Sequence, residues 1–80
     1  MYFVYIIYSN IFDRFYVGIT SDLDKRVNTH NSKRVKSTKA FVPWNLIHFE
    51  EFETRIEARK RERYLKSAAG RRWRKQNLGH

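Results

Sequence analysis

The chain has 80 residues, which is enough for one small domain, and we predict a single domain over residues 1–80. It contains no cysteine, so disulfides and thiolate metal sites are excluded, and no apolar run approaches the ~20 residues that a membrane-spanning helix needs. The net charge is +9, and all of the excess lies in residues 33–80, which hold fourteen basic but only five acidic residues. This distribution favours nucleic acid as the partner, and a solubilising surface is the alternative. The lack of a membrane-spanning run and of a signal-peptide pattern predicts a cytoplasmic protein with no membrane partner.

Two segments near the start predict a β-hairpin. Residues 2–8 and 14–20 are rich in aromatic and β-branched side chains, and only a short polar connection separates them. If the turn pairs the strands symmetrically, Tyr5 lies opposite Gly18 and shares one face of the sheet with Tyr16. Gly18 would then leave space beside the Tyr5 ring. Ordinary packing of the two tyrosines remains the alternative to a chemical role.

The rest of the chain predicts one strand and three helices, with a basic loop between the first helix and the strand. We expect a helix from Ser21 to about Asn31, an exposed irregular loop over 32–42, a strand over 44–52, a helix from Thr54 to about Lys66, an interruption over Ser67 to Gly70, and a short helix over Arg71 to Gln76. Ser21 and Asp24 resemble a capping box at the first helix start. The order β-β-α-β-α-α predicts an α+β fold, a three-stranded antiparallel sheet flanked by helices.

Each of the first two helices carries polar side chains beside its apolar face. Leu23 and Val27 define that face of the first helix, and Arg26 and His30 fall on the same arc. An arginine there needs an anionic partner or the edge of a cleft, although a snorkelling arginine and a surface histidine remain the alternative. In the second helix Glu62 lies between two apolar positions, where it is either a salt-bridge hub or a metal ligand. His48, in the third strand, is expected to be structural.

Together these residues resemble the GIY-YIG nuclease family, in particular small single-domain bacterial proteins similar to the N-terminal nuclease domain of an excision-repair protein. Phe3-Val4-Tyr5 stands where the family has Gly-Ile-Tyr, and Tyr16-Val17-Gly18 stands where it has Tyr-Ile-Gly. Arg26, His30 and Glu62 follow in the family's order and spacing. The resemblance covers nearly the whole chain.

The resemblance implies a metal-dependent endonuclease that cleaves phosphodiester bonds of nucleic acid, with DNA and a role in repair or recombination favoured. Glu62 would bind Mg²⁺ or Mn²⁺, and Arg26 would hold the scissile phosphate. Tyr5 or Tyr16 would activate the attacking water, and His30 would shuttle a proton or steady a tyrosine hydroxyl. These five side chains are expected to converge on one concave face.

Six basic residues are expected to bind neighbouring phosphates: Lys33, Arg34, Lys36, Lys39, Arg71 and Arg72. The sequence leaves two alternatives to a nuclease open. One is a nucleic-acid-binding module that keeps the fold without catalysis, and the other is a domain that binds a protein partner through its aromatic surface.

Overall fold

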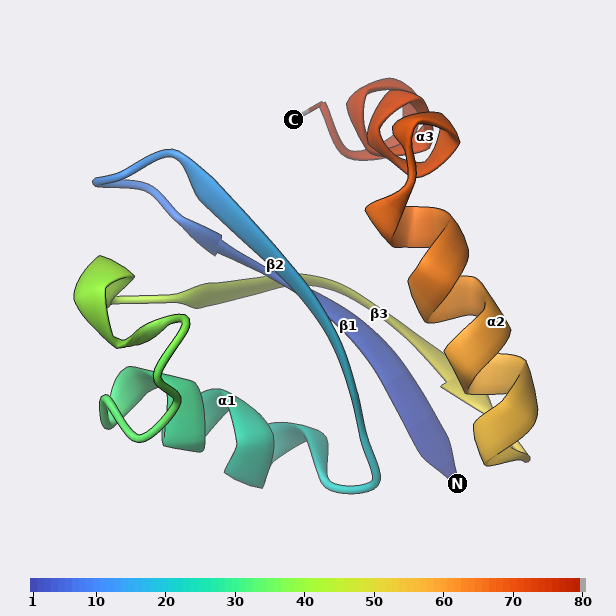
Figure 1. Ribbon diagram of the computed structural model, residues 1–80, viewed down its shortest axis with the longest axis horizontal. Coiled ribbons are helices and arrows are strands. Elements are labelled where there is room, and N and C mark those ends of the chain that lie inside the picture. The colour runs from blue at the N-terminus through green and yellow to red at the C-terminus, as the bar shows by residue number, and fades with distance from the viewer. Residues whose placement is uncertain (80) are drawn as a thin grey trace.

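A computed structural model describes residues 1–79, and His80, the last residue of the predicted domain, lies outside the described residues. The elements are β1 (Tyr2–Ser9), β2 (Arg14–Thr20), α1 (Leu23–Asn31), a short 3-10 helix η1 (Lys39–Phe41), β3 (Asn45–Phe52), α2 (Arg55–Lys66) and α3 (Ala68–Leu78) (Figure 1). The three strands form one antiparallel sheet, so the predicted α+β fold and element order are confirmed. Among residues 1–79 no helix combines the length and apolar composition that crossing a membrane requires.

The sheet has the strand order β2-β1-β3, with β1 in the centre. The hairpin register is the predicted one, since Tyr8 pairs with Phe15 and Tyr5 pairs with Gly18. Both β2 and β3 are edge strands in the described part of the chain. The outer edge of β2 therefore presents backbone N–H and C=O groups that no other strand pairs with.

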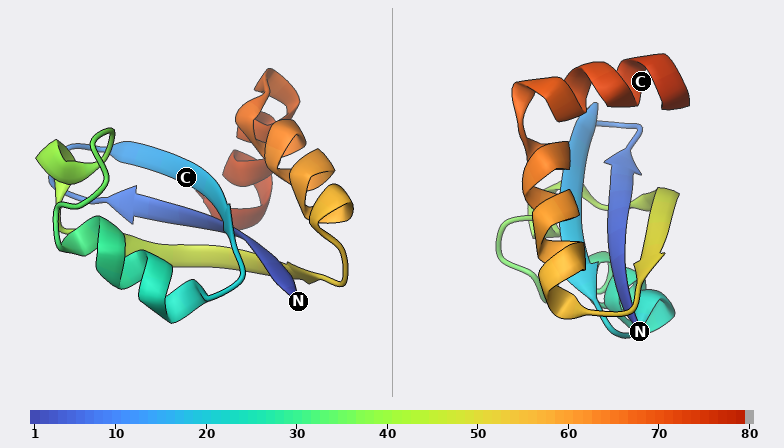
Figure 2. Two further views of the ribbon diagram at one scale, coloured as in Figure 1. Left: turned by 60° about the horizontal axis from the view of Figure 1, so that its bottom comes forward. Right: turned by 90° about the vertical axis from the view of Figure 1, so that its right-hand side faces the viewer.

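Each face of the sheet buries its own apolar cluster, because successive β1 side chains point to opposite faces. Val4 and Ile6 pack with Ala58 and Leu65 of α2 on one face. Tyr5 and Ile7 pack with Trp44 on the other, against partly buried side chains of α1. Figure 2 shows α1 and α2 on opposite sides of the sheet.

The helix ends differ from the prediction in two places. The N-cap of α1 is Asp22, whose carboxylate accepts from the Lys25 backbone N–H at 3.2 Å, so the predicted start at Ser21 is one residue early. The predicted interruption shrinks to Ser67, which follows α2 and caps α3 by accepting from the Gly70 N–H at 3.2 Å. α3 therefore begins at Ala68, before the predicted Arg71.

The basic segment after α1 is more ordered than an exposed irregular loop. The Asn31 side chain accepts from the Trp44 backbone N–H at 2.6 Å and donates to the Trp44 carbonyl at 3.0 Å. The buried Trp44 indole in turn donates to the carbonyl of Thr38 at 2.9 Å. These bonds hold the segment against the sheet and place Thr38, which is also buried, beneath α1.

Candidate active site at the free edge of β2

The ring of Tyr5 crosses Gly18 of the neighbouring strand and is completely buried, with 0% of its surface exposed. A Cβ atom added at Gly18 would lie 2.5 Å from Cζ of Tyr5, closer than such contacts occur. Glycine is thus required here, because it lets the tyrosine hydroxyl extend over β2 toward the free edge of the sheet.

A chain of hydrogen bonds runs inward from Arg26. Arg26 Nε donates to the Tyr5 hydroxyl at 3.4 Å, and that hydroxyl lies 2.8 Å from His30 Nε2. His30 Nδ1 lies 2.8 Å from Thr38 Oγ1, and the Thr38 hydroxyl donates to the Val35 carbonyl at 3.4 Å. With the Thr38 hydroxyl donating to Val35, the consistent arrangement has His30 Nδ1 donating to Thr38 and Nε2 accepting from Tyr5. All four bonds then point the same way, which fixes the tautomer of His30 and the proton of Tyr5.

The electrostatics of this chain keep the imidazole neutral and the guanidinium charged. Burial, and secondly the positive charge of Arg26, lower the pKa of His30 from 6.5 to about 4. The hydrogen bond to Tyr5 raises the pKa of Arg26. Burial raises the pKa of Tyr5 above 10.0, and the charge of Arg26 only partly offsets this. Tyr5 therefore keeps its proton at neutral pH and is better suited to positioning Arg26 than to acting as a base.

The low pKa of His30 predicts a pH dependence of stability. The unfolded chain binds a proton at His30 near pH 6.5, whereas the folded chain does so only near pH 4. The contribution of His30 to the free energy of unfolding is therefore complete above pH 6.5. It is lost as the pH drops toward 4, by about 3 kcal/mol in total. We expect urea unfolding at several pH values to show this fall, and the His30→Gln variant to lack most of it.

Titration of Glu50 limits the pH range in which this test reports on His30 alone. Burial by itself would raise the pKa of Glu50, but hydrogen bonds from Arg61 and His48 lower it overall below 4.5. Its contribution is lost only below that value, so the range from pH 6.5 to 4.5 reports on His30. Equal pH slopes for wild type and His30→Gln in that range would contradict the assignment.

Tyr16 is the more accessible of the two motif tyrosines. It is half-buried, and its ring centroid lies 4.9 Å from that of His30 and 6.3 Å from that of Tyr5. A hydrogen bond to Tyr16 also contributes to the raised pKa of Arg26. The guanidinium of Arg26 thus lies beside both tyrosine hydroxyls.

Glu62 comes from a helix that lies across the sheet from α1. It belongs to α2, whose buried Ala58 and Leu65 pack on the opposite face of the sheet from Tyr5. Its carboxylate is a salt-bridge hub, 9% exposed as a residue, that lies 3.2 Å from Lys66 Nζ and 3.8 Å from Arg59 Nε. Its charge still contributes to raising the pKa of Tyr5.

Two hollows open beside this edge. One, of about 390 Å³, lies where β2 leads into α1 and is lined by Thr20, Lys25 and Arg26 among others. The other, of about 540 Å³, includes Tyr16 and also Lys66, the ion-pair partner of Glu62. Arg26 and Tyr16 therefore both border open space at the edge of β2.

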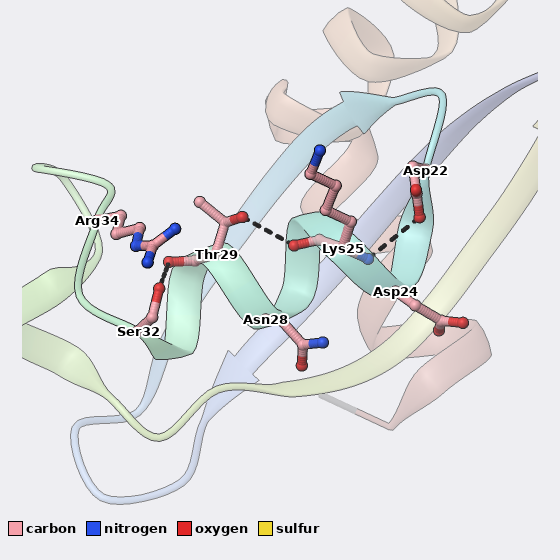
Figure 3. A pocket seen from close by; sticks show the side chains of 7 residues that line it. All are labelled: Asp22, Asp24, Lys25, Asn28, Thr29, Ser32 and Arg34. Carbon is pink, nitrogen blue, oxygen red and sulfur yellow. Dashed lines mark hydrogen bonds between the residues drawn. The ribbon is translucent and has the colours of Figure 1, made fainter.

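A further hollow, on the outer face of α1, lies apart from the tyrosine pair. Figure 3 shows Asp22, Lys25 and Arg34 around it, with their side chains on the solvent side of the helix. Its volume is about 530 Å³, and its acidic and basic side chains balance in number. Arg34 is the only predicted phosphate-binding residue that lines it, and this mixed charge gives an anion little preference for it.

The predicted phosphate-binding residues divide between two places. Four lie on the segment between α1 and β3, namely Lys33, Arg34, Lys36 and Lys39, and two lie on α3, namely Arg71 and Arg72. Of these six, Arg71 borders the hollow that contains Tyr16.

Sequence reasoning missed two features of this region. Thr38 gave no signal, because its role depends on how the loop folds beneath α1. Arg14 and Arg74 line the hollow beside Tyr16. Arg14 belongs to the electrically neutral first part of the chain and Arg74 is one of fourteen basic residues in the second, so neither stood out in the sequence.

The side chains available as metal ligands suit a hard cation, such as Mg²⁺, that the protein alone binds weakly. Within residues 1–79 no group of three or more His, Cys, Asp or Glu side chains could enclose a metal. Glu62 is a single carboxylate, and Mg²⁺ commonly binds through one or two carboxylates, several waters and substrate phosphate oxygens. The residues present therefore fit a cation that is completed by the substrate.

Residues 1–77 match the family model for the GIY-YIG catalytic domain, so the chain belongs to the GIY-YIG family, a family of nucleases. Members of this family act on nucleic acid and generally depend on a divalent metal. Within it, the chain is similar to UPF0213 proteins. It is 39% identical over 67 residues to one from Haloquadratum walsbyi, covering 82% of this chain and 74% of that protein.

Another relative and a solved structure are also UPF0213 proteins. A UPF0213 protein of Bacillus velezensis is 44% identical over 62 residues, which is 76% of this chain and 62% of the relative. The solution NMR structure of a UPF0213 protein from Bacillus halodurans matches with a TM-score of 0.54 at 28% identity, covering 91% of this chain and 81% of that one.

Proposed function

We propose that this chain is a divalent-metal-dependent endonuclease that hydrolyses phosphodiester bonds of DNA. The observation that carries this proposal is the placement of Arg26. Its guanidinium is fixed by Tyr5, lies beside the half-buried Tyr16 and borders a hollow of about 390 Å³. A buried network that exists only to pack the core would not need a permanently charged group at its open end.

In this proposal Arg26 binds the scissile phosphate and stabilises the negative charge that develops on its oxygens. Tyr5 and the neutral His30 hold the guanidinium in place through the directed hydrogen-bond chain. Tyr16 contacts the attacking water, because it is the tyrosine that borders open space. This assignment favours Tyr16 over Tyr5 as the group that acts on the water.

Glu62 would hold the cation, Mg²⁺ or Mn²⁺. When bound, such an ion would polarise the phosphate and make its coordinated water more acidic. Lys66 and Arg59 already balance the charge of Glu62 in the chain alone. The exposed cations after α1 would guide DNA by long-range attraction, and the proposed setting is DNA repair or recombination.

The test is incubation of the purified protein with supercoiled plasmid, single-stranded DNA and branched DNA, each with Mg²⁺, Mn²⁺ or a chelator. We expect cleavage of at least one DNA substrate that requires a divalent cation. Salt-dependent binding without cleavage on every substrate would favour the non-catalytic binding module.

A further inference from the structure

The hollow beside Tyr16 is strongly basic. Its volume is about 540 Å³, and its charged members come from the start of β2, from the last turn of α2 and from α3. Among residues 1–79 they are four cations, Arg14, Lys66, Arg71 and Arg74, and a single carboxylate, Asp13. That carboxylate already accepts a hydrogen bond from the Tyr8 hydroxyl at 2.9 Å.

Two of the cations of this hollow contact neighbouring side chains that hold them in place. The Arg74 guanidinium stacks on the Phe15 ring, 3.7 Å from its centroid, and Lys66 is fixed by its ion pair with Glu62. Burial, and then the positive charge of Arg71, lower the pKa of Arg74, and the charge of Asp13 partly offsets this. Arg71 and Arg74 therefore repel each other in this hollow. An anion in the hollow would relieve that repulsion.

The position of the hollow relative to Arg26 suggests which anion it receives. From Arg14 to Thr20, the ends of β2, the strand rises roughly 3.3 Å per residue, which separates its two ends by about 20 Å. The basic hollow lies at the Arg14 end of this strand, and the hollow that Arg26 borders lies at the Thr20 end. Backbone N–H groups on the unpaired edge between the two hollows are further donors for phosphate oxygens.

We propose that the hollow formed by Arg14, Arg71 and Arg74 binds the sugar-phosphate backbone of nucleic acid to one side of the cleaved bond. One strand then follows the free edge of β2, from the hollow past Tyr16 to Arg26. The inference rests on the proposed function for the location of the cleaved bond, but binding in the hollow does not require cleavage.

The experiment measures binding of the full chain to a short DNA duplex, of about 12 base pairs, in chelator over a range of salt concentrations. Each phosphate contact contributes about 0.9 to the slope of log affinity against log salt. The Arg14→Gln/Arg71→Gln double variant should bind more weakly and lose about 1.8 of that slope. Because Arg14 also lies over the Phe41 ring, Arg71→Gln alone serves as a second variant, with an expected loss of about 0.9.

The matched control is Arg55→Gln/Arg63→Gln, which removes the same charge from two exposed arginines that line a separate hollow on α2. It should leave the slope close to that of the wild type. Equal losses of slope in the control and in the hollow variants would overturn the proposal, as would a wild type that does not bind.

A cleavage assay separates this inference from the proposed function. If the wild type cleaves, the hollow variants should raise KM and leave kcat nearly unchanged. If the wild type binds but never cleaves, and the slopes differ as expected, the hollow assignment stands while the nuclease assignment fails.

Discussion

Replacing Arg26 by alanine should reduce DNA cleavage by about 10²–10³-fold, which is the usual loss when one donor to a developing negative charge is removed. The charge of Arg26 lies beside both tyrosine hydroxyls and borders open space, and no other side chain of the hydrogen-bond chain carries a charge at neutral pH. The measurement is the rate of plasmid nicking at saturating metal. Arg26→Lys should recover only part of the rate, because an ammonium lacks the planar fork of donors.

The pKa of His30 provides a second measurement, which tests whether Arg26→Ala acts at the hydrogen-bond chain. The charge of Arg26 helps to lower the pKa of His30, so Arg26→Ala should raise that pKa toward 6.5, as followed by NMR titration of the imidazole. Arg63→Ala, which removes an exposed charge on α2, should change neither the rate nor this pKa. Nicking by Arg26→Ala at the wild-type rate would exclude the phosphate-binding role.

Replacing Glu62 by glutamine should lower cleavage by at least about 100-fold at low Mg²⁺. Outer partners of metal ligands typically account for about 10–100-fold in metal affinity or activity, so loss of the ligand's own charge should cost no less. Glutamine keeps the shape of a nearly buried side chain, and the fold should be retained. The measurement is the nicking rate as a function of Mg²⁺ concentration.

Metal rescue distinguishes this role from a structural one. Excess Mg²⁺ should restore part of the Glu62→Gln activity but none of the activity of Arg26→Ala. Glu53→Gln, a change at an exposed carboxylate just before α2, provides the control and should respond to Mg²⁺ as the wild type does. A Glu62→Gln protein as active as wild type at low Mg²⁺ would remove Glu62 from the metal site and leave it as a salt-bridge hub.

The hairpin and its register could be predicted from the sequence because they depend on local pattern. Alternation along two adjacent strands and a short connection suffice to place Tyr5 against Gly18. The inward direction of Arg26 and His30 also followed from helical spacing, and the structure shows His30 fully buried. The catalytic roles of these residues stay predictions.

Features that depend on tertiary packing could not be predicted in this way. Periodicity placed Glu62 beside the core face of α2, but it cannot tell which face of the sheet that helix covers. The role of Thr38 depends on Trp44 and Asn31 folding the basic segment beneath α1. The basic hollow depends on α3 returning to the start of β2, which brings Arg74 onto Phe15.

The most direct test of the nuclease assignment compares the wild type with an Arg26→Ala/Glu62→Gln double variant that is purified identically. Both proteins are incubated with supercoiled plasmid in Mg²⁺ and in chelator. We expect nicking by the wild type in Mg²⁺ only, and none by the double variant under either condition. Equal nicking by the two proteins, or nicking by the wild type that persists in chelator, would contradict it.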